Sequence, residues 1–141
     1  MTRTSTLRLI DANLNRALEG VRVCEEIIRF HVKSPRTFRR LRALRHGIAA
    51  AMRRLPIPPG ELLGARDSAR DLGRRAPTGR VDSLERLAAL NLQRAKEALR
   101  VLEECARILA PRRTADFQRL RFRAYEIERD VLQRLATLRY R

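Results

Sequence analysis

The sequence has few aromatic residues and almost no lysine. Aromatic residues make up 4% of the 141 residues, tryptophan is absent, and the apolar content is 44%. That apolar content comes mostly from leucine, alanine, valine and isoleucine, which favours helices over strands. A chain of this length buries roughly two thirds of its unfolded surface, so it needs neither disulfides nor a structural metal to fold. We predict one all-α domain over residues 1–141.

Cysteine is also scarce, and long apolar runs are missing. Cys24 and Cys105 are the two cysteines, and they form no C-x-x-C pair. Both fall at apolar helical positions, which favours buried free thiols over a disulfide or a metal site. No apolar run approaches the ~20 residues of a membrane span, and the N-terminus lacks a signal-peptide core. These absences predict a cytoplasmic protein with no membrane partner.

Common catalytic and phosphate-binding motifs are missing too, whereas positive charge is abundant. There is no GxxxxGK[ST] loop, no GxGxxG turn and no serine elbow. The net charge is +16 from 32 basic and 16 acidic residues. Only Lys33 and Lys96 are lysines, which leaves 32 − 2 = 30 arginines. Because arginine binds phosphate bidentately, anionic partners are predicted; the alternative is an arginine-biased composition on solvated helix faces.

The chain contains an internal repeat. ALNLQRAKEALRVLEECARI at 89–108 repeats the pattern of IDANLNRALEGVRVCEEIIRF at 10–30. Between 13–30 and 91–108, ten of eighteen aligned positions are identical. FRRLRALRHGI at 38–48 likewise resembles FQRLRFRAYEI at 117–127. The repeated unit is therefore a helical hairpin, with halves at about 5–55 and 82–139.

Helical spacing and capping residues define four long helices. Thr4 to Thr6 are expected to cap the first helix, Ser34-Pro35 to start the second, and Asp82 with Glu85 to open the third. Apolar residues recur every three or four positions in each segment, which predicts four seams buried in one core. Two such hairpins form a four-helix bundle, and its sites arise between facing helices. Gly47 is expected to mark a close helix crossing.

The segment at 56–81 interrupts the helical pattern and concentrates glycine and charge. It is expected to be a long functional crossover loop. Within ARDSARDLG at 65–73, Asp67 and Asp71 are candidate magnesium ligands, and Arg66 is a candidate phosphate ligand. The alternative is that the aspartates form turns or caps.

The repeated helices supply further candidates. Asn13 and Arg16 recur as Asn91 and Arg94, and we predict that the two pairs face one another across a substrate cleft. The alternative for this quartet is hydrogen bonding between helices. His46 and Tyr125 occupy equivalent positions and are candidates for stacking on a heteroaromatic ring, although packing is the commoner role of such a histidine. The copies differ at Asp11 and Ala89, and this difference should mark the half that holds the reacting phosphates.

Four motifs resemble, in the same order, those of the monofunctional hydroxymethylpyrimidine-phosphate kinase family of thiamine synthesis. They are DANLNRALEGVRVCEE at 11–26, ARDSARDLG at 65–73, NLQRAKEALRVLEE at 91–104 and RFRAYEIE at 121–128. That domain is often fused ahead of thiamine-phosphate synthase. The resemblance implies transfer of a phosphoryl group from ATP, with Mg²⁺, onto 4-amino-5-hydroxymethyl-2-methylpyrimidine phosphate. The phosphorylated pyrimidine and the nucleotide are then its small-molecule partners. Our hypothesis assigns catalytic roles to Arg66, Asp67 and Asp71, a loop role to Gly73, phosphate binding to Arg16 and Arg94, and substrate positioning to Asp11, Asn13 and Asn91.

Two other functions are compatible with the residues. A chorismate-mutase-like helical enzyme would use arginines to bind a dianion, but it leaves the ARDSARDLG motif unexplained. A basic helical protein would bind nucleic acid, but arginine alternates with glutamate on the repeated helices, which argues against this partner. The sequence leaves open whether the chain is a monomer or a homodimer.

Overall fold

The computed structural model describes residues 2–139, and in that part of the chain every regular element is helical. The predicted all-α class is therefore confirmed. The long helices are α1 (Arg3–Ile27), α2 (Pro35–Arg53), α4 (Leu84–Leu109) and α5 (Thr114–Arg139). The short elements are a π-helical turn η1 (Ile28–Val32), helix α3 (Glu61–Ala65) and two 3₁₀ turns, η2 (Ser68–Arg70) and η3 (Pro111–Arg113).

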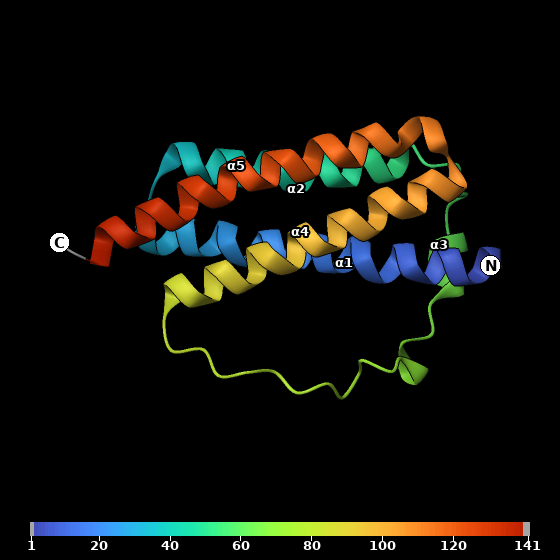
Figure 1. Ribbon diagram of the computed structural model, residues 1–141, viewed down its shortest axis with the longest axis horizontal. Coiled ribbons are helices and arrows are strands. Elements are labelled where there is room, and N and C mark those ends of the chain that lie inside the picture. The colour runs from blue at the N-terminus through green and yellow to red at the C-terminus, as the bar shows by residue number, and fades with distance from the viewer. Residues whose placement is uncertain (1, 140–141) are drawn as a thin grey trace.

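The long helices form a four-helix bundle made of two hairpins. α1 and α2 form one hairpin, α4 and α5 form the other, and the long helices run alongside one another (Figure 1). α1 packs mainly against α4 and α2, whereas α5 packs mainly against α4 and α2. Each helix therefore has two close neighbours, and α1 lies diagonally opposite α5.

The predicted apolar seams form the core. Ile10, Ala17, Val21, Cys24 and Ile28 of the first seam are buried, and Leu14 is partly buried. The seams of α2, α4 and α5 are likewise largely buried, while Leu84 at the start of α4 is exposed. Cys24 and Cys105 are buried free thiols, as predicted.

Two of the three expected caps are shifted by a residue or more. Thr2 caps α1, because its side chain accepts a hydrogen bond from the Ser5 amide. Ser83, rather than Asp82, caps α4 by accepting from the Arg86 amide. Ser34 caps α2 as predicted, with Pro35 at the first helical position. Short hydroxyls at these positions satisfy amides that have no partner within the helix.

Two glycines mark close helix contacts. A Cβ on Gly47 would lie 3.0 Å from Leu120 Cδ2, so the predicted close crossing is confirmed between α2 and α5. A Cβ on Gly20 would lie 2.7 Å from the backbone oxygen of Asn91. The α1 and α4 backbones therefore meet at Gly20, where a larger residue would force them apart.

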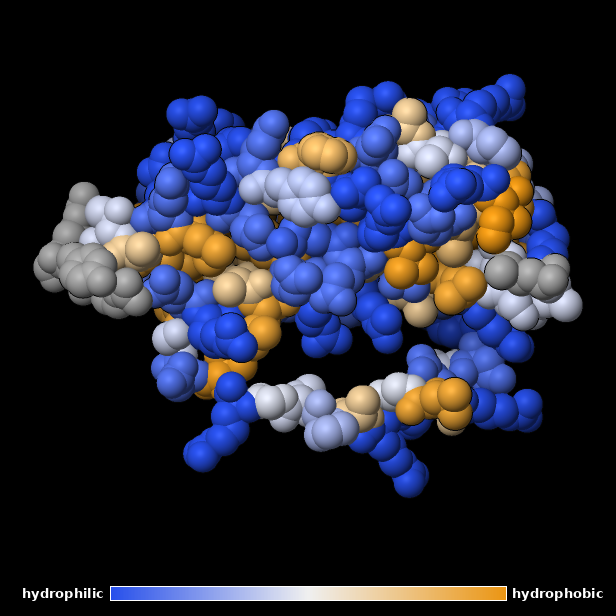
Figure 2. Space-filling model, in the orientation of Figure 1, coloured by the Kyte–Doolittle hydropathy of each residue, from blue (hydrophilic) through white to orange (hydrophobic). Residues whose placement is uncertain are grey.

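The crossover, expected to be a long loop over 56–81, also includes short helical elements. It contains α3 and η2, and Arg3 and Arg8 of α1 hold it through Glu61 and the Ala65 carbonyl. Beyond Arg70 it is exposed, and Figure 2 shows open space between this stretch and the bundle. Within residues 2–139, no helix is long and apolar enough to cross a membrane.

Candidate functional site

A cavity of about 600 Å³ lies between α1 and the first part of the crossover. One helical face of α1 forms one wall, and the residues around η2 form the other. The α1 wall consists of Arg8, Asp11, Ala12, Asn15, Arg16 and Glu19. The crossover wall consists of Arg66, Asp67, Ser68, Arg70, Asp71 and Leu72. Five residues predicted from the sequence therefore share one cavity: Asp11, Arg16, Arg66, Asp67 and Asp71.

A bidentate ion pair joins the two walls. Arg66 Nε and Nη2 donate to the two carboxylate oxygens of Asp11 at 2.7 and 2.8 Å. Asp11 is buried, and its hydrogen bonds raise the pKa of the Arg66 guanidinium. Two parallel hydrogen bonds fix the orientation of both groups. This pair explains one difference between the repeats, because Ala89 has no carboxylate with which to hold an arginine.

The two candidate metal ligands differ in their surroundings. The Asp67 carboxylate is 3.9 Å from both Arg8 Nη2 and Arg70 Nη1, which is too long for a hydrogen bond. Asp71 Oδ1 accepts a hydrogen bond of 2.7 Å from the Gly73 amide, which closes a turn. Gly73 therefore serves the loop by orienting Asp71 and does not line the cavity. Asp71 therefore also forms a turn, through one of its two carboxylate oxygens.

The side chains of this cavity could bind Mg²⁺, but they could supply only part of its coordination shell. Within residues 2–139, no group of three or more histidine, cysteine or acidic side chains is arranged to hold a metal ion. Magnesium commonly takes one or two carboxylates and completes its shell with water and substrate phosphates. Asp67 and Asp71, on one wall of the cavity, supply that number of carboxylates.

The cavity contains equal numbers of basic and acidic side chains. Its arginines are Arg8, Arg16, Arg66 and Arg70, and its acidic residues are Asp11, Glu19, Asp67 and Asp71. Arg66 forms an ion pair with Asp11. Arg16 is exposed, and its side chain makes no hydrogen bond or ion pair with the described residues. Arg16 is therefore the arginine most available to a phosphate group.

The repeated asparagines Asn13 and Asn91 do not face one another as predicted. The Asn91 carbonyl lies at Gly20, seven residues from Asn13 and therefore about 10 Å farther along α1. Each asparagine amide donates to a carbonyl of its own helix: Asn13 to Leu9 at 2.8 Å and Asn91 to Leu87 at 2.9 Å. The antiparallel packing of α1 and α4 separates these equivalent positions, and Asn13, Asn91 and Arg94 lie outside the cavity lining.

His46 and Tyr125 also lie outside the cavity, on α2 and α5. Tyr125 Oη accepts a hydrogen bond of 2.8 Å from Arg121 Nη1. The Tyr125 ring packs edge-on against Phe122, and Lys96 Nζ lies 5.5 Å from its centroid. Tyr125 therefore has protein partners on α4 and α5. His46 is exposed and has no such contacts.

Several cavity residues are absent from the predicted site: Arg8, Ala12, Asn15, Glu19, Ser68, Arg70 and Leu72. Those on α1 follow the spacing 8, 12, 15, 19, which places them on one face beside Asp11 and Arg16. That spacing is visible in the sequence. The crossover residues carry no comparable signal, because irregular backbone has no fixed period.

The part of the chain that resembles a known family includes the whole cavity lining. The model of the ThiD2 family matches residues 8–130, which include every residue of the cavity lining and most of both hairpins. The chain belongs to the ThiD2 family. No solved structure gives a significant match.

Relatives of this ThiD2 chain include parts of longer proteins named thiamine-phosphate synthase. The protein from Synechocystis sp. is 36% identical over 132 residues, which is 92% of this chain and 37% of the relative. That from Rhodopirellula baltica is 34% identical over 140 residues, 97% of this chain and 37% of the relative. The protein from Gloeobacter violaceus is 36% identical over 141 residues, 94% of this chain and 40% of the relative. The ThiD2 chain thus spans little more than a third of these relatives.

Proposed function

We propose that the chain is a kinase that transfers the γ-phosphoryl group of ATP to 4-amino-5-hydroxymethyl-2-methylpyrimidine phosphate. The observation that carries the proposal is the single cavity that gathers Arg16, Arg66, Asp67 and Asp71 from α1 and the crossover. Membership of the ThiD2 family and the names of its relatives support a role in thiamine synthesis. The product would then serve a thiamine-phosphate synthase.

The reaction requires positioning more than proton transfer. An oxygen of the acceptor phosphate forms a bond to the γ-phosphorus while the bond to the β-phosphate oxygen breaks, which releases ADP. A phosphate monoester is largely ionised near neutral pH, so no strong general base is needed. Holding the two phosphates together and neutralising their charge supplies most of the catalysis.

In this proposal the two walls have different tasks. Arg16, which has no protein partner, binds phosphate oxygens, and Arg8 and Arg70 add positive charge beside Asp67. Asp11 holds Arg66 in one orientation, so Arg66 presents its remaining N–H groups without first being ordered. The Asp11–Arg66 pair also keeps the crossover at a fixed position on α1.

The charge balance of the cavity supports a need for a cation. Four arginines face four carboxylates there, so the cavity by itself offers no net positive charge to two anionic substrates. Asp67 and Asp71 would hold Mg²⁺, which would supply the positive charge that two phosphate groups need. The exposure of Asp71 and the long ion pairs of Asp67 are consistent with this role.

The test is a coupled assay of the purified chain with ATP, Mg²⁺ and the pyrimidine phosphate, in which both ADP and the diphosphate product are measured. We expect turnover in the wild type and a loss of about 100-fold or more in Asp67→Asn, which removes a metal-binding charge but keeps the shape. Asp82→Asn, an exposed change outside the cavity, is the matched control.

Two results would overturn the proposal. If the folded wild type gave no diphosphate, the reaction itself would be wrong. If Asp67→Asn kept full turnover at saturating Mg²⁺, the metal role of Asp67 would be wrong and the reaction would stand.

A further inference from the structure

A basic groove of about 370 Å³ lies on the outer face between α2 and α5. Its polar lining is Arg36, Arg39 and Arg40 from α2 with Arg123 and Glu126 from α5. It shares no residue with the cavity at α1. Because α5 lies diagonally opposite α1 in the bundle, the groove is a separate feature of the molecule.

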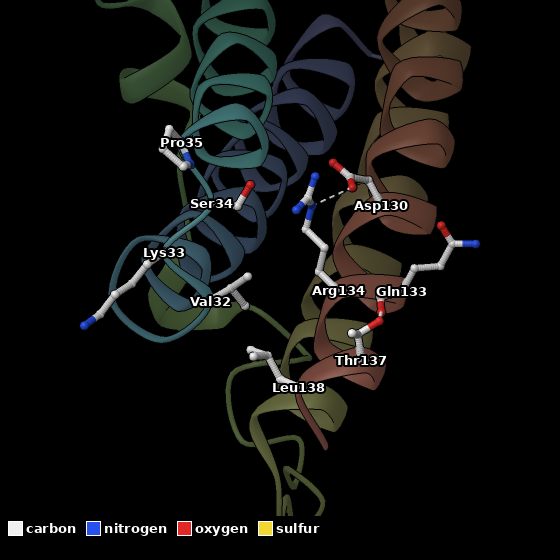
Figure 3. Close-up of a pocket in the computed structure, with 9 residues that line it drawn as sticks. All are labelled: Val32, Lys33, Ser34, Pro35, Asp130, Gln133, Arg134, Thr137 and Leu138. Atoms are coloured by element: carbon white, nitrogen blue, oxygen red, sulfur yellow. Dashed lines mark hydrogen bonds and ion pairs between the residues drawn. The ribbon is translucent and has the colours of Figure 1, made fainter. Parts of the chain in front are cut away.

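Three of the four arginines in this groove have no partner. Arg40 Nη1 pairs with Asp130 at 3.1 Å. Arg36, Arg39 and Arg123 are exposed, and their side chains make no hydrogen bond, ion pair or ring contact within residues 2–139. Figure 3 shows a separate cavity between residues 32–35 and the C-terminal part of α5. There, by contrast, Arg134 points at Asp130 and donates to it at 2.9 Å. Three guanidinium groups in the groove therefore have N–H donors with no acceptor among the described residues.

The stability of α2 does not account for these arginines. Between Pro35 and Arg54 the chain has no acidic residue, so no carboxylate on α2 itself offsets the charge. Arg36 lies in the first helical turn, where the helix dipole disfavours positive charge. An anion between α2 and α5 would remove both the repulsion among the arginines and the conflict with the dipole.

The size of the groove limits the size of the anion. Its volume is at the low end for small-molecule pockets. Glu126, in the groove lining, adds one negative charge beside the arginines. The geometry favours a compact anion.

We propose that the α2–α5 groove is a second anion site, which binds the diphosphate or triphosphate group of a small ligand. Arg36 and Arg39 approach from α2 and Arg123 approaches from α5, so phosphate oxygens bridge the two helices. The groove lining includes no aromatic residue, so recognition rests on the phosphate groups and not on a ring.

The probe is inorganic tripolyphosphate, titrated calorimetrically into the full chain without ATP or metal. Three variants separate the sites: R36A/R39A/R123A for the groove, R16A/R70A for the α1 cavity, and R75A/R80A/R86A as a control. The control removes three exposed arginines, and thus the same charge, from the crossover and the start of α4.

We expect the groove variant to bind tripolyphosphate at the α2–α5 site at least about tenfold more weakly than the wild type, because several charge-assisted hydrogen bonds are lost. R16A/R70A should keep this site, and the control should keep wild-type affinity. Circular dichroism checks the fold; if the triple variant does not fold, R36Q/R123Q replaces it.

Three outcomes would overturn the inference. The groove variant could bind with wild-type affinity and stoichiometry, or it could lose no more affinity than the control, which would show a net-charge effect only. It could also lose binding to a DNA duplex while its tripolyphosphate binding stayed unchanged, which would identify a polymer as the ligand. Because no turnover is measured, failure of the proposed kinase reaction would leave this test unaffected.

Discussion

At the scale of single residues, a buried glutamate is repeated in both halves of the molecule. Glu25 of α1 and Glu103 of α4 are equivalent in the repeat, and both are buried. Glu25 accepts two hydrogen bonds from Arg45, and Glu103 accepts two from Arg121. The partner arginines occupy different repeat positions, since Arg121 aligns with Arg42. In each hairpin, an arginine of the second helix thus pairs with the equivalent buried glutamate, but the two arginines lie on different turns of their helices.

We predict that Glu25→Gln lowers the free energy of unfolding at pH 7 by about 3 kcal/mol, because it leaves Arg45 without its buried partner. Burial alone would raise the pKa of Glu25, but the hydrogen bonds and charge of Arg45, with Arg22 and Arg42, lower it below its ordinary value of 4.5. The stabilisation is therefore present above pH 4.5 and is lost as the pH falls through the folded-state pKa. Urea unfolding across this range measures both effects.

The control for this prediction is Glu26→Gln, one residue along. Glu26 pairs with Arg22 at 2.9 Å on the exposed face of α1, and such pairs contribute roughly 0.5 kcal/mol or less. Equal losses in the two variants would contradict the prediction.

At the scale of elements, α1 and α4 approach each other closely at Gly20. Gly20 lets the α1 backbone reach the Asn91 carbonyl, and the equivalent residue in α4 is Ala98. The two hairpins therefore do not meet with perfect symmetry.

Gly20→Ala is predicted to destabilise the protein by about 1–3 kcal/mol, because its Cβ would meet a backbone oxygen that cannot rotate away. In an open helical position the same substitution stabilises by up to about 1 kcal/mol. Gly64→Ala in α3 is the matched control, since nothing lies within 4 Å of its Cβ. Chemical denaturation of both variants measures the difference, and a stable Gly20→Ala protein would refute the close approach.

At the scale of the whole molecule, the bundle has one continuous core that reaches all four long helices. Cys24 lies within it with no exposed surface, and its thiol donates to the Ala88 carbonyl at 3.4 Å. Burial raises the pKa of Cys24 to about 12, and the charge of Glu128 contributes. The thiol is therefore protonated and unreactive at neutral pH.

We predict that Cys24 reacts with a thiol reagent at pH 8 only when the bundle opens as a whole. In a Cys105→Ala background, the labelling rate of Cys24 should rise with urea in parallel with global unfolding measured by circular dichroism. In unfolded chain the same thiol should react at the rate of a free cysteine. Rapid labelling in native buffer, independent of urea, would show instead that α1 and α4 separate locally.

The sequence by itself determined the fold class, the four helices and most of the core, because apolar spacing and an internal repeat are properties of the chain alone. It also identified Asp11, Arg16, Arg66, Asp67 and Asp71, which share one cavity. It failed for the predicted meeting of Asn13 with Asn91, because equivalence in a repeat does not imply proximity.

Only the tertiary structure decided which residues meet. Antiparallel packing of α1 on α4 placed Asn13 and Asn91 apart, and the path of the crossover brought Arg66 to Asp11. Likewise, the unpaired Arg36, Arg39 and Arg123 share one groove only because α2 and α5 lie side by side. Periodicity fixes which face of a helix is buried, but the partner of each face depends on contacts between segments far apart in the chain.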